Sequence, residues 1–243
     1  SVSRGLGDVY KRQLFVFVAA MSLFSCSKGD DSTPKLELKE TNYNLIVNEE
    51  VQLELVNTDI DISDCDIKSE DDFVVQSYGR RVSALHVGTT QLTINYKGAS
   101  TSCTVNVESV NNYVIDPYLN FEQATNINDI SSYHKEEPIS MDTSNIDSDV
   151  SLIKYQPGNG IYYITYAYSR TLKRILAVTE EIGTYTNKMI EINSSLMDRC
   201  KLLSTGGDIW YVRPNKYYVR VTQGRTSYLI KYAASQSDVE KSW

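Results

Sequence analysis

The sequence predicts a β-rich chain of two domains, an all-β sandwich followed by an α+β domain whose antiparallel sheet has helices on one face. Residues 36–107 break into short segments in which apolar and polar residues alternate, as in half-buried strands. Beyond residue 111, two stretches with helical spacing are each followed by strand-like segments. Fourteen of the 18 tyrosines lie in this second part, so its composition differs from that of the first.

The first 25 residues are expected to lie outside the fold. Residues 1–13 resemble a translated sequencing adapter. An apolar run over residues 14–24 follows, and it is shorter than the roughly 20 helical residues that a bilayer requires. We therefore assign residues 14–25 to a signal peptide and expect no later segment to span a membrane.

The apolar run ends in Leu23-Phe24-Ser25-Cys26, which resembles the lipobox of bacterial lipoproteins. That resemblance implies cleavage before Cys26 and a diacylglycerol group on its sulfur, which would hold the protein on a membrane. Residues 26–34 form a polar tether. Within it, Lys28-Gly29-Asp30-Asp31 resembles the surface-export signal of Bacteroidota lipoproteins, although Gly29 interrupts the pattern. We expect an outer-membrane protein displayed at the cell surface, with a periplasm-facing protein as the alternative.

Residues 35–108 are assigned to the sandwich. Val51, Leu53 and Leu55 alternate with polar residues, so they are expected to share a core face. About seven strands over such a length is typical of an immunoglobulin-like sandwich. The expected strands cover residues 36–39, 44–47, 51–56, 65–68, 73–77, 81–87, 90–96 and 102–107.

This segment also resembles a bacterial Ig-like group 2 domain. The best marker is Val82-Ser83-Ala84-Leu85-His86-Val87-Gly88-Thr89-Thr90, in which Gly88 is expected to turn the chain and Thr89 to open the next strand. Asp66-Ile67 departs from the family, which often has a tryptophan at this place. The resemblance implies a spacer or adhesive module of bacterial surface proteins and does not identify a ligand.

Residues 111–235 are assigned to the α+β domain. The order helix, strand, strand, strand occurs twice, so two duplicated αβββ units are one interpretation and a chance match is the other. The segment also resembles uncharacterised C-terminal domains of Bacteroidota lipoproteins, and that resemblance implies no known chemistry. The expected helices cover residues 121–134 and 186–203, and the expected strands cover 150–155, 161–168, 172–179, 208–212, 216–222 and 227–232.

The cysteines have different expected roles. Cys65 and Cys103 fall in the same sandwich, so in an oxidising compartment they either form a disulfide or remain as two buried thiols. Cys200 lies on an apolar helical stripe, which predicts a buried and inert thiol.

Tyrosine and tryptophan in the second domain are the candidate ligand-binding residues. On a sheet with one uncovered face, Tyr162, Tyr166, Trp210 and Tyr217 would form an aromatic platform. Strand alternation places Tyr163 opposite Tyr162, so we expect Tyr163 to pack on the helix. The competing interpretation is that these are ordinary half-buried strand tyrosines.

Several function classes are disfavoured. A net charge of −7 without a Lys/Arg run is unsuited to nucleic acid. The two histidines, His86 and His134, fall in different predicted domains, and the sequence has no known catalytic motif. The acidic residues between positions 59 and 72 lack the spacing and glycine of a calcium loop. We therefore assign no catalytic residue, metal or other cofactor.

The sequence as a whole predicts a non-catalytic outer-membrane lipoprotein in which an Ig-like spacer presents a C-terminal binding or adhesion domain for a glycan or a protein. One alternative is an enzyme or accessory factor of a polysaccharide-uptake system, which requires a concave polar pocket. The other is a purely structural envelope spacer, which requires a sheet face without aromatic clusters.

Overall fold

The computed structural model describes residues 34–56, 59–111, 117–142, 149–158, 160–183, 188–205 and 207–242. The expected signal segment, the expected tether up to residue 33 and the expected lipid site Cys26 lie outside these residues. Pro34–Trp243 form one compact unit. Among the described residues, no helix has both the length and the hydropathy needed to cross a membrane.

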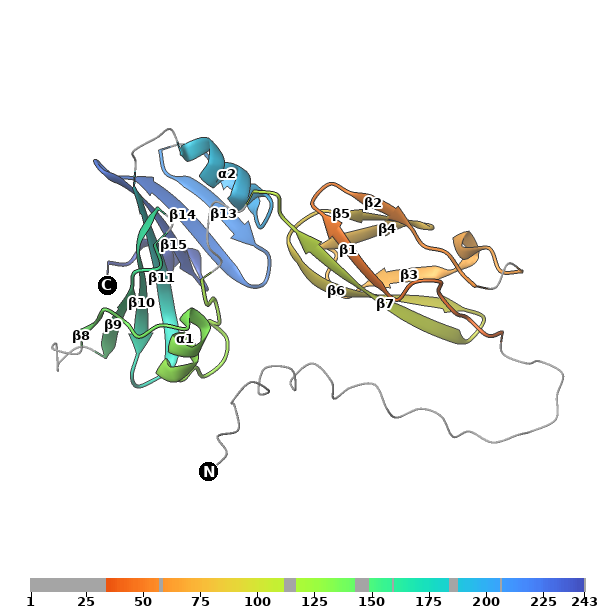
Figure 1. Cartoon of the computed structure of the whole chain (residues 1–243), viewed down its shortest axis with the longest axis horizontal. Coiled ribbons are helices and arrows are strands. Elements are labelled where there is room, and N and C mark those ends of the chain that lie inside the picture. Colours follow the sequence, from red (N-terminus) through yellow and green to blue (C-terminus); the bar gives the residue numbers. More distant parts are fainter. Residues whose placement is uncertain are drawn as a thin grey trace, which may run out of the picture. The chain divides into compact units, whose positions relative to one another are not determined.

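Two small sheets pack together over the first part of the unit, and we call strands β1–β7 the sandwich (Figure 1). One sheet has the order β1-β7-β6-β3 and the other has the order β2-β5-β4. Their shared core includes Leu53, Val75, Val82, Leu92 and Val105, all at most 1% exposed. The strands are β1 (Asn42–Ile46), β2 (Glu50–Gln52), β3 (Asp66–Ser69), β4 (Val75–Tyr78), β5 (Arg81–Ala84), β6 (Gly88–Tyr96) and β7 (Ala99–Glu108).

The alternation in the sequence corresponds to the observed strands, with local differences. The strand expected at residues 36–39 is reduced to a single bridge between Leu38 and Leu55. Gly88 opens β6 with φ of 153°, and a Cβ at this position would lie 2.9 Å from Cγ2 of Val74. The glycine is therefore required by a close approach as well as by the backbone conformation.

The second part of the unit is an eight-stranded antiparallel sheet with the order β12-β13-β14-β15-β11-β10-β9-β8. Two helix-plus-strand halves meet where β11 pairs with β15 (Figure 1). Each half has four strands instead of the expected three, because the sequence pattern did not predict the short strands at the two edges of the sheet. The strands are β8 (Ser140–Asp142), β9 (Val150–Tyr155), β10 (Ile161–Ser169), β11 (Arg174–Gly183), β12 (Lys201–Ser204), β13 (Ile209–Arg213), β14 (Tyr217–Gln223) and β15 (Ser227–Ala233).

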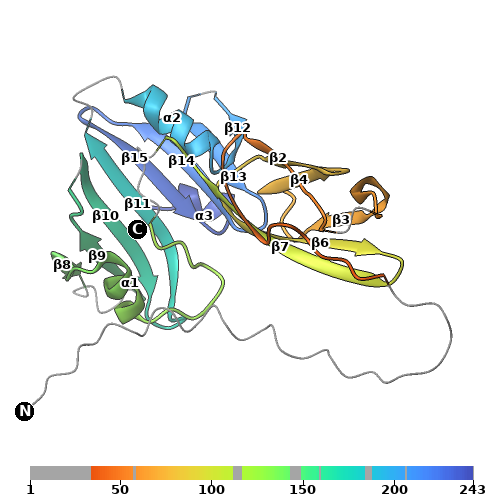
Figure 2. The same ribbon diagram turned by 45° about the vertical axis from the view of Figure 1, so that its right-hand side comes forward.

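The helices cover both faces of this sheet, which corrects the expectation of helices on one face. α1 (Ile127–His134) and α2 (Met189–Met197) contribute Ile130, Ile192 and Leu196 to the main core of the sheet. The short α3 (Gln236–Glu240) packs against β11, β14 and β15 (Figure 2). Its Val239 belongs to a separate cluster, on strand residues that alternate with those of the main core.

Both long helices are shorter than expected. α1 begins at Ile127 instead of residue 121, because Asn126 and Asp129 form a reciprocal capping box there. α2 ends at Met197 instead of continuing to residue 203. The apolar stripe that predicted the longer helix runs on into β12, where Leu203 is 47% exposed.

Arg213 of β13 is buried and contacts the sandwich. Its Nη2 lies 3.2 Å from Oδ2 of Asp71, and its Nη1 donates to the carbonyl of Val87 at 3.3 Å. The guanidinium also lies 4.4 Å from the ring centre of Phe73. The positive charge therefore has a carboxylate, a carbonyl and an aromatic face as partners, which a buried arginine needs.

Candidate functional site

Tyr166 lies in the core, so its assignment to an exposed platform is wrong. Its side chain is 0% exposed. Its neighbours across the strands, Ile153 and Val178, are also buried. The hydroxyl accepts a hydrogen bond from the backbone N–H of Tyr118 at 3.0 Å and pairs with Nε2 of His134 at 2.7 Å. Burial also raises the pKa of Tyr166 well above its usual value. The buried ring and the two partners of its hydroxyl mean that this residue serves packing.

The other predicted platform residues do not form one surface. Tyr217 packs against the main core, with its ring centre 6.0 Å from that of Tyr232. Tyr162 lies at a bulge of β10. Its hydroxyl group lies over Gly183, so a Cβ added to Gly183 would be 2.5 Å from the Tyr162 hydroxyl oxygen. Trp210 packs with the α3 cluster on the opposite face. Trp210 therefore lies on the less covered side of the sheet, whereas Tyr166 and Tyr217 belong to the main core or pack against it.

We call the sheet side that carries α3 the open face. Its residues are mostly half-buried, whereas the residues alternating with them are buried beneath α1 and α2. Tyr163 lies on the open face, because the neighbouring Ile164 points into the core. The expectation that Tyr163 packs on a helix is therefore also corrected. Tyr218 shares the open face, so the half-buried aromatic residues of this face include Tyr163, Trp210 and Tyr218.

Strand register brings polar side chains into a line across the open face, which we call the basic row. Each member lies directly opposite the next on the neighbouring strand. The row consists of Lys154, Thr165, Thr179, Lys231, Arg220 and Trp210, from β9 to β13. All six side chains are half-buried, so the row remains accessible to solvent.

A parallel line of small residues supports the approach of α3. Ala167, Ala177 and Ala233 are opposite one another on β10, β11 and β15. Val239 of α3 packs on these three alanines. Because alanine adds little height to the sheet, the helix covers this line and leaves the neighbouring basic row half-exposed.

The charges of the basic row have few acidic neighbours. Nε of Arg220 donates to Oδ2 of Asp208 at 2.6 Å. Nζ of Lys154 lies 3.5 Å from the ring centre of Tyr163, in a cation–π arrangement. Burial is the main cause that lowers the pKa of Lys231, the charge of Arg220 lowers it further, and Asp238 opposes both.

A hollow of about 210 Å³ lies beside the middle of the basic row. It is lined by Leu152, Thr165, Ala167, Thr179 and Lys231. Pockets that enclose a small molecule usually have about 300–1,000 Å³. The hollow is therefore suited to receive one group of a ligand that extends along the surface.

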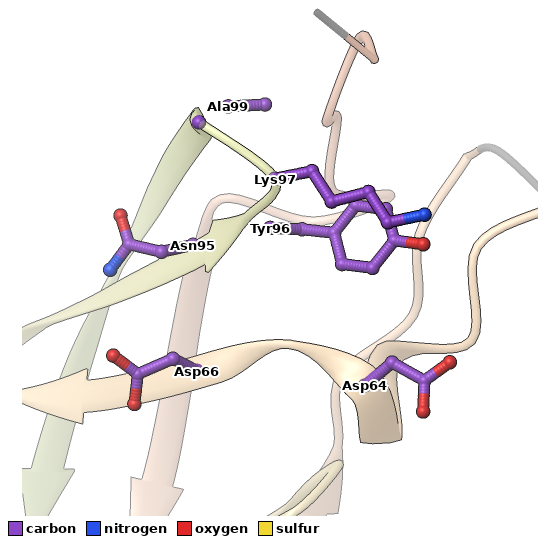
Figure 3. Close-up of a pocket in the computed structure, with 7 residues that line it drawn as sticks. Asp64, Asp66, Asn95, Tyr96, Lys97 and Ala99 are labelled. Carbon is purple, nitrogen blue, oxygen red and sulfur yellow. The ribbon is translucent and has the colours of Figure 1, made fainter.

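A second hollow, of about 500 Å³, lies on the sandwich between β3 and the β6–β7 turn (Figure 3). Its acidic side chains, Asp64 and Asp66, point in different directions in this view. Asp66 pairs with Lys68 at 3.0 Å, and both side chains are exposed. Within the part of the chain that the structure describes, no group of three or more potential metal ligands occurs.

Cys65 and Cys103 are both free thiols, so the disulfide alternative is not realised in this structure. Sγ of Cys65 donates to the carbonyl of Asp61 at 3.9 Å. Burial raises the pKa of Cys103 to about 11, which keeps it protonated at neutral pH. Cys200 is 2% exposed in the main core and donates to the hydroxyl of Tyr217 at 3.9 Å, as expected for a structural thiol.

Comparison with known proteins gives little further information. No family model matches the chain, and no curated protein matches it. Among solved structures, domains 5–6 of the S-layer protein SbsC align over 86% of both chains with 11% identity and a TM-score of 0.25. A structure of domains 4–9 of the same protein aligns over 86% of this chain and 27% of its own, with 12% identity and a TM-score of 0.25. Likenesses at this level carry no argument about function.

Proposed function

We propose that this chain is a non-catalytic lipoprotein of the outer membrane, displayed at the cell surface, in which an Ig-like spacer domain presents a C-terminal α+β domain that binds a glycan. The lipobox-like Cys26, the polar tether and the sandwich-like sheets with an Ig-like group 2 sequence pattern support the first part of this proposal. The open face of the eight-stranded sheet supports the second.

The observation that carries the binding proposal is the half-exposed aromatic set Tyr163, Trp210 and Tyr218 on one face of a well-packed sheet. Flat rings with few rotamers provide contact area at a low entropic cost, and their polar groups tolerate water. The hollow of about 210 Å³ on the same face is smaller than a pocket that encloses a small molecule, which favours binding of an extended chain over turnover of an enclosed substrate.

A purely structural spacer is the second candidate, since the sandwich has the sequence pattern of spacer modules. The open face distinguishes the two candidates by experiment, because a spacer without a ligand needs Trp210 and Tyr218 only for packing against the α3 cluster, whereas a binding domain also needs them for contact with the ligand. The binding proposal therefore predicts a specific loss of function upon removal of Trp210.

A glycan array probed with the mature chain tests the proposal, followed by calorimetry with the glycans that bind. Trp210→Ala should abolish binding and lower the urea midpoint only modestly, because Trp210 is half-buried and packs against the α3 cluster on the open face. Tyr78→Ala is the matched control, since Tyr78 is 67% exposed on the sandwich. Equal binding by Trp210→Ala and the wild type would refute the assigned face.

Anchoring requires a separate test. Cys26→Ala should release the protein from the outer-membrane fraction, because a single lipidated terminus is the only membrane attachment that the proposal includes. External protease applied to intact wild-type cells then distinguishes surface display from a periplasmic location. A Cys26→Ala variant that still fractionates with the outer membrane would contradict the lipid anchor.

A further inference from the structure

We propose that the open face binds an acidic polysaccharide, with the carboxylates of uronic acid units bound along the basic row of Lys154, Lys231 and Arg220. This inference rests on the proposed glycan-binding function and specifies the class of glycan. It depends on strand register, charge and the positions of hydroxyl donors on the open face.

Like charges face each other in the basic row. Lys231 of β15 lies directly opposite Arg220 of β14. Like charges at directly opposed positions of an antiparallel pair destabilise a sheet. This chain has a net charge of −7, yet neither of the two positions holds an acidic residue. Asp208 offsets part of the charge of Arg220, and an anionic ligand beside Lys231 would relieve the repulsion that remains.

The acidic groups near the basic row neutralise only part of its positive charge. Asp208 is engaged with Arg220, and Asp238 of α3 pairs with Lys241. Glu181 lies two positions from Thr179 on β11, opposite Tyr163 and Leu229. Lys154 and Lys231 are therefore the cations of the row that are available to an external carboxylate.

Donor geometry favours a carboxylate. Lys231 and Thr179 are directly opposite across β15 and β11. The ammonium group has three N–H donors, and one of them is used by the carbonyl of Lys241. The lysine therefore keeps two N–H donors and the threonine hydroxyl adds a third, so one donor from each residue can serve the two oxygens of one carboxylate. Thr179 and Lys231 also line the hollow of about 210 Å³.

The spacing of the cations favours a polymer over a small anion. Lys154 and Lys231 are separated by three strand-to-strand steps through Thr165 and Thr179. At about 4.8 Å per step, the backbones of the two lysines lie roughly 14 Å apart. A single small anion cannot contact both, whereas a chain with repeated carboxylates can. Trp210, at the far end of the row, then provides a ring for stacking on a sugar.

Polygalacturonate is the probe, and its carboxyl-reduced form is the neutral control. The mature chain should bind polygalacturonate, and the carboxyl-reduced polymer should bind roughly tenfold or more weakly. Lys231→Gln should weaken polygalacturonate binding by roughly tenfold, the effect of one charge-assisted hydrogen bond. Lys216→Gln, which changes an exposed lysine in the turn before β14, is the matched control and should leave affinity unchanged.

The failure of this inference is distinguishable from that of the proposed function. If both polymers bind equally, and only Trp210→Ala abolishes binding, the open face binds glycans and the acidic specificity is wrong. If dextran sulfate binds and polygalacturonate does not, the carboxylate assignment is wrong. If no glycan binds the correctly folded wild type, both the inference and the proposed function are wrong. Thermal unfolding of each variant confirms folding, and Lys231→Gln should be at least as stable as the wild type because it removes the like-charge pair.

Discussion

Replacement of Tyr166 by phenylalanine tests the assignment of the two sheet faces. The change keeps the ring in the core and removes the hydroxyl that accepts from the Tyr118 N–H at 3.0 Å and pairs with Nε2 of His134 at 2.7 Å. A buried polar group left without its partner costs about 1–3 kcal/mol. Because Tyr118 and His134 are half-buried, and water can replace part of the loss, we expect Tyr166→Phe to lower the free energy of unfolding by about 2 kcal/mol.

Urea unfolding of the mature chain, monitored by tryptophan fluorescence and by circular dichroism, measures this change. Tyr166→Ala should cost about 3–5 kcal/mol, as large-to-small substitutions of buried aromatic residues do. Tyr163→Phe and Tyr163→Ala are the matched controls on the neighbouring position of the open face and should cost clearly less than the corresponding Tyr166 variants. If Tyr163→Ala destabilises the protein more than Tyr166→Ala does, the two faces have been assigned the wrong way round.

Three further predictions concern other parts of the molecule. Gly88→Ala should destabilise the protein by about 1–3 kcal/mol, because it adds both backbone strain and a close contact. Denaturation curves should show a smaller loss of stability for Gly79→Ala, where φ is +59° and no atom lies within 4 Å of the added Cβ. Asp71→Asn should cost about 2 kcal/mol in the same assay because it leaves the buried charge of Arg213 without its carboxylate, and an unchanged urea midpoint would contradict a contribution from this pair. Burial lowers the pKa of His134, so the unfolded chain binds the proton more readily than the folded chain does. The contribution of His134 to stability should therefore be full above about pH 6.5 and should fall as the pH drops through the folded-state pKa. His134→Gln should flatten this pH dependence.

The sequence predicted the strands of the sandwich well, because half-buried strands alternate between apolar and polar residues. Val51, Leu53 and Leu55 show this pattern: Val51 of β2 packs against the core, and the segment after β2 contributes Leu53 and Leu55 to it. The edge strands β8 and β12 were missed for the same physical reason. Their residues are all exposed, so no alternation marks them, and the stripe of the preceding helix appeared to continue through β12.

Strand alternation correctly placed Tyr163 and Tyr166 on opposite faces of β10, but it assigned the two residues to the wrong faces, and Tyr162 falls outside the alternation because the register shifts between Ile161 and Tyr163. Tyr166 has the same parity as Ile164, which is 0% exposed, whereas Tyr163 has the parity of Thr165 and Ala167. A set that contains isoleucine is the better candidate for the core, and β15 repeats the pattern with Ile230 among its buried residues. The tyrosines did not indicate which face is buried, because a tyrosine can pack its ring in the interior and form hydrogen bonds there with its hydroxyl group.

The basic row could not be read from the sequence, because it is a product of register between distant strands. Thr179 and Lys231 are neighbours only because β11 pairs with β15 across the junction of the two halves, and the sequence carries no local signal for that pairing. Thr165 and Arg220 join the row through two further pairings with independent registers. A shift of one residue in the β11–β15 pairing would place Lys231 opposite Val178 or Glu180 and turn its side chain toward the core. The buried Val178 and Ile230 on the opposite face oppose such a shift, so the packing beneath α1 and α2 also fixes the positions of the charges on the open face.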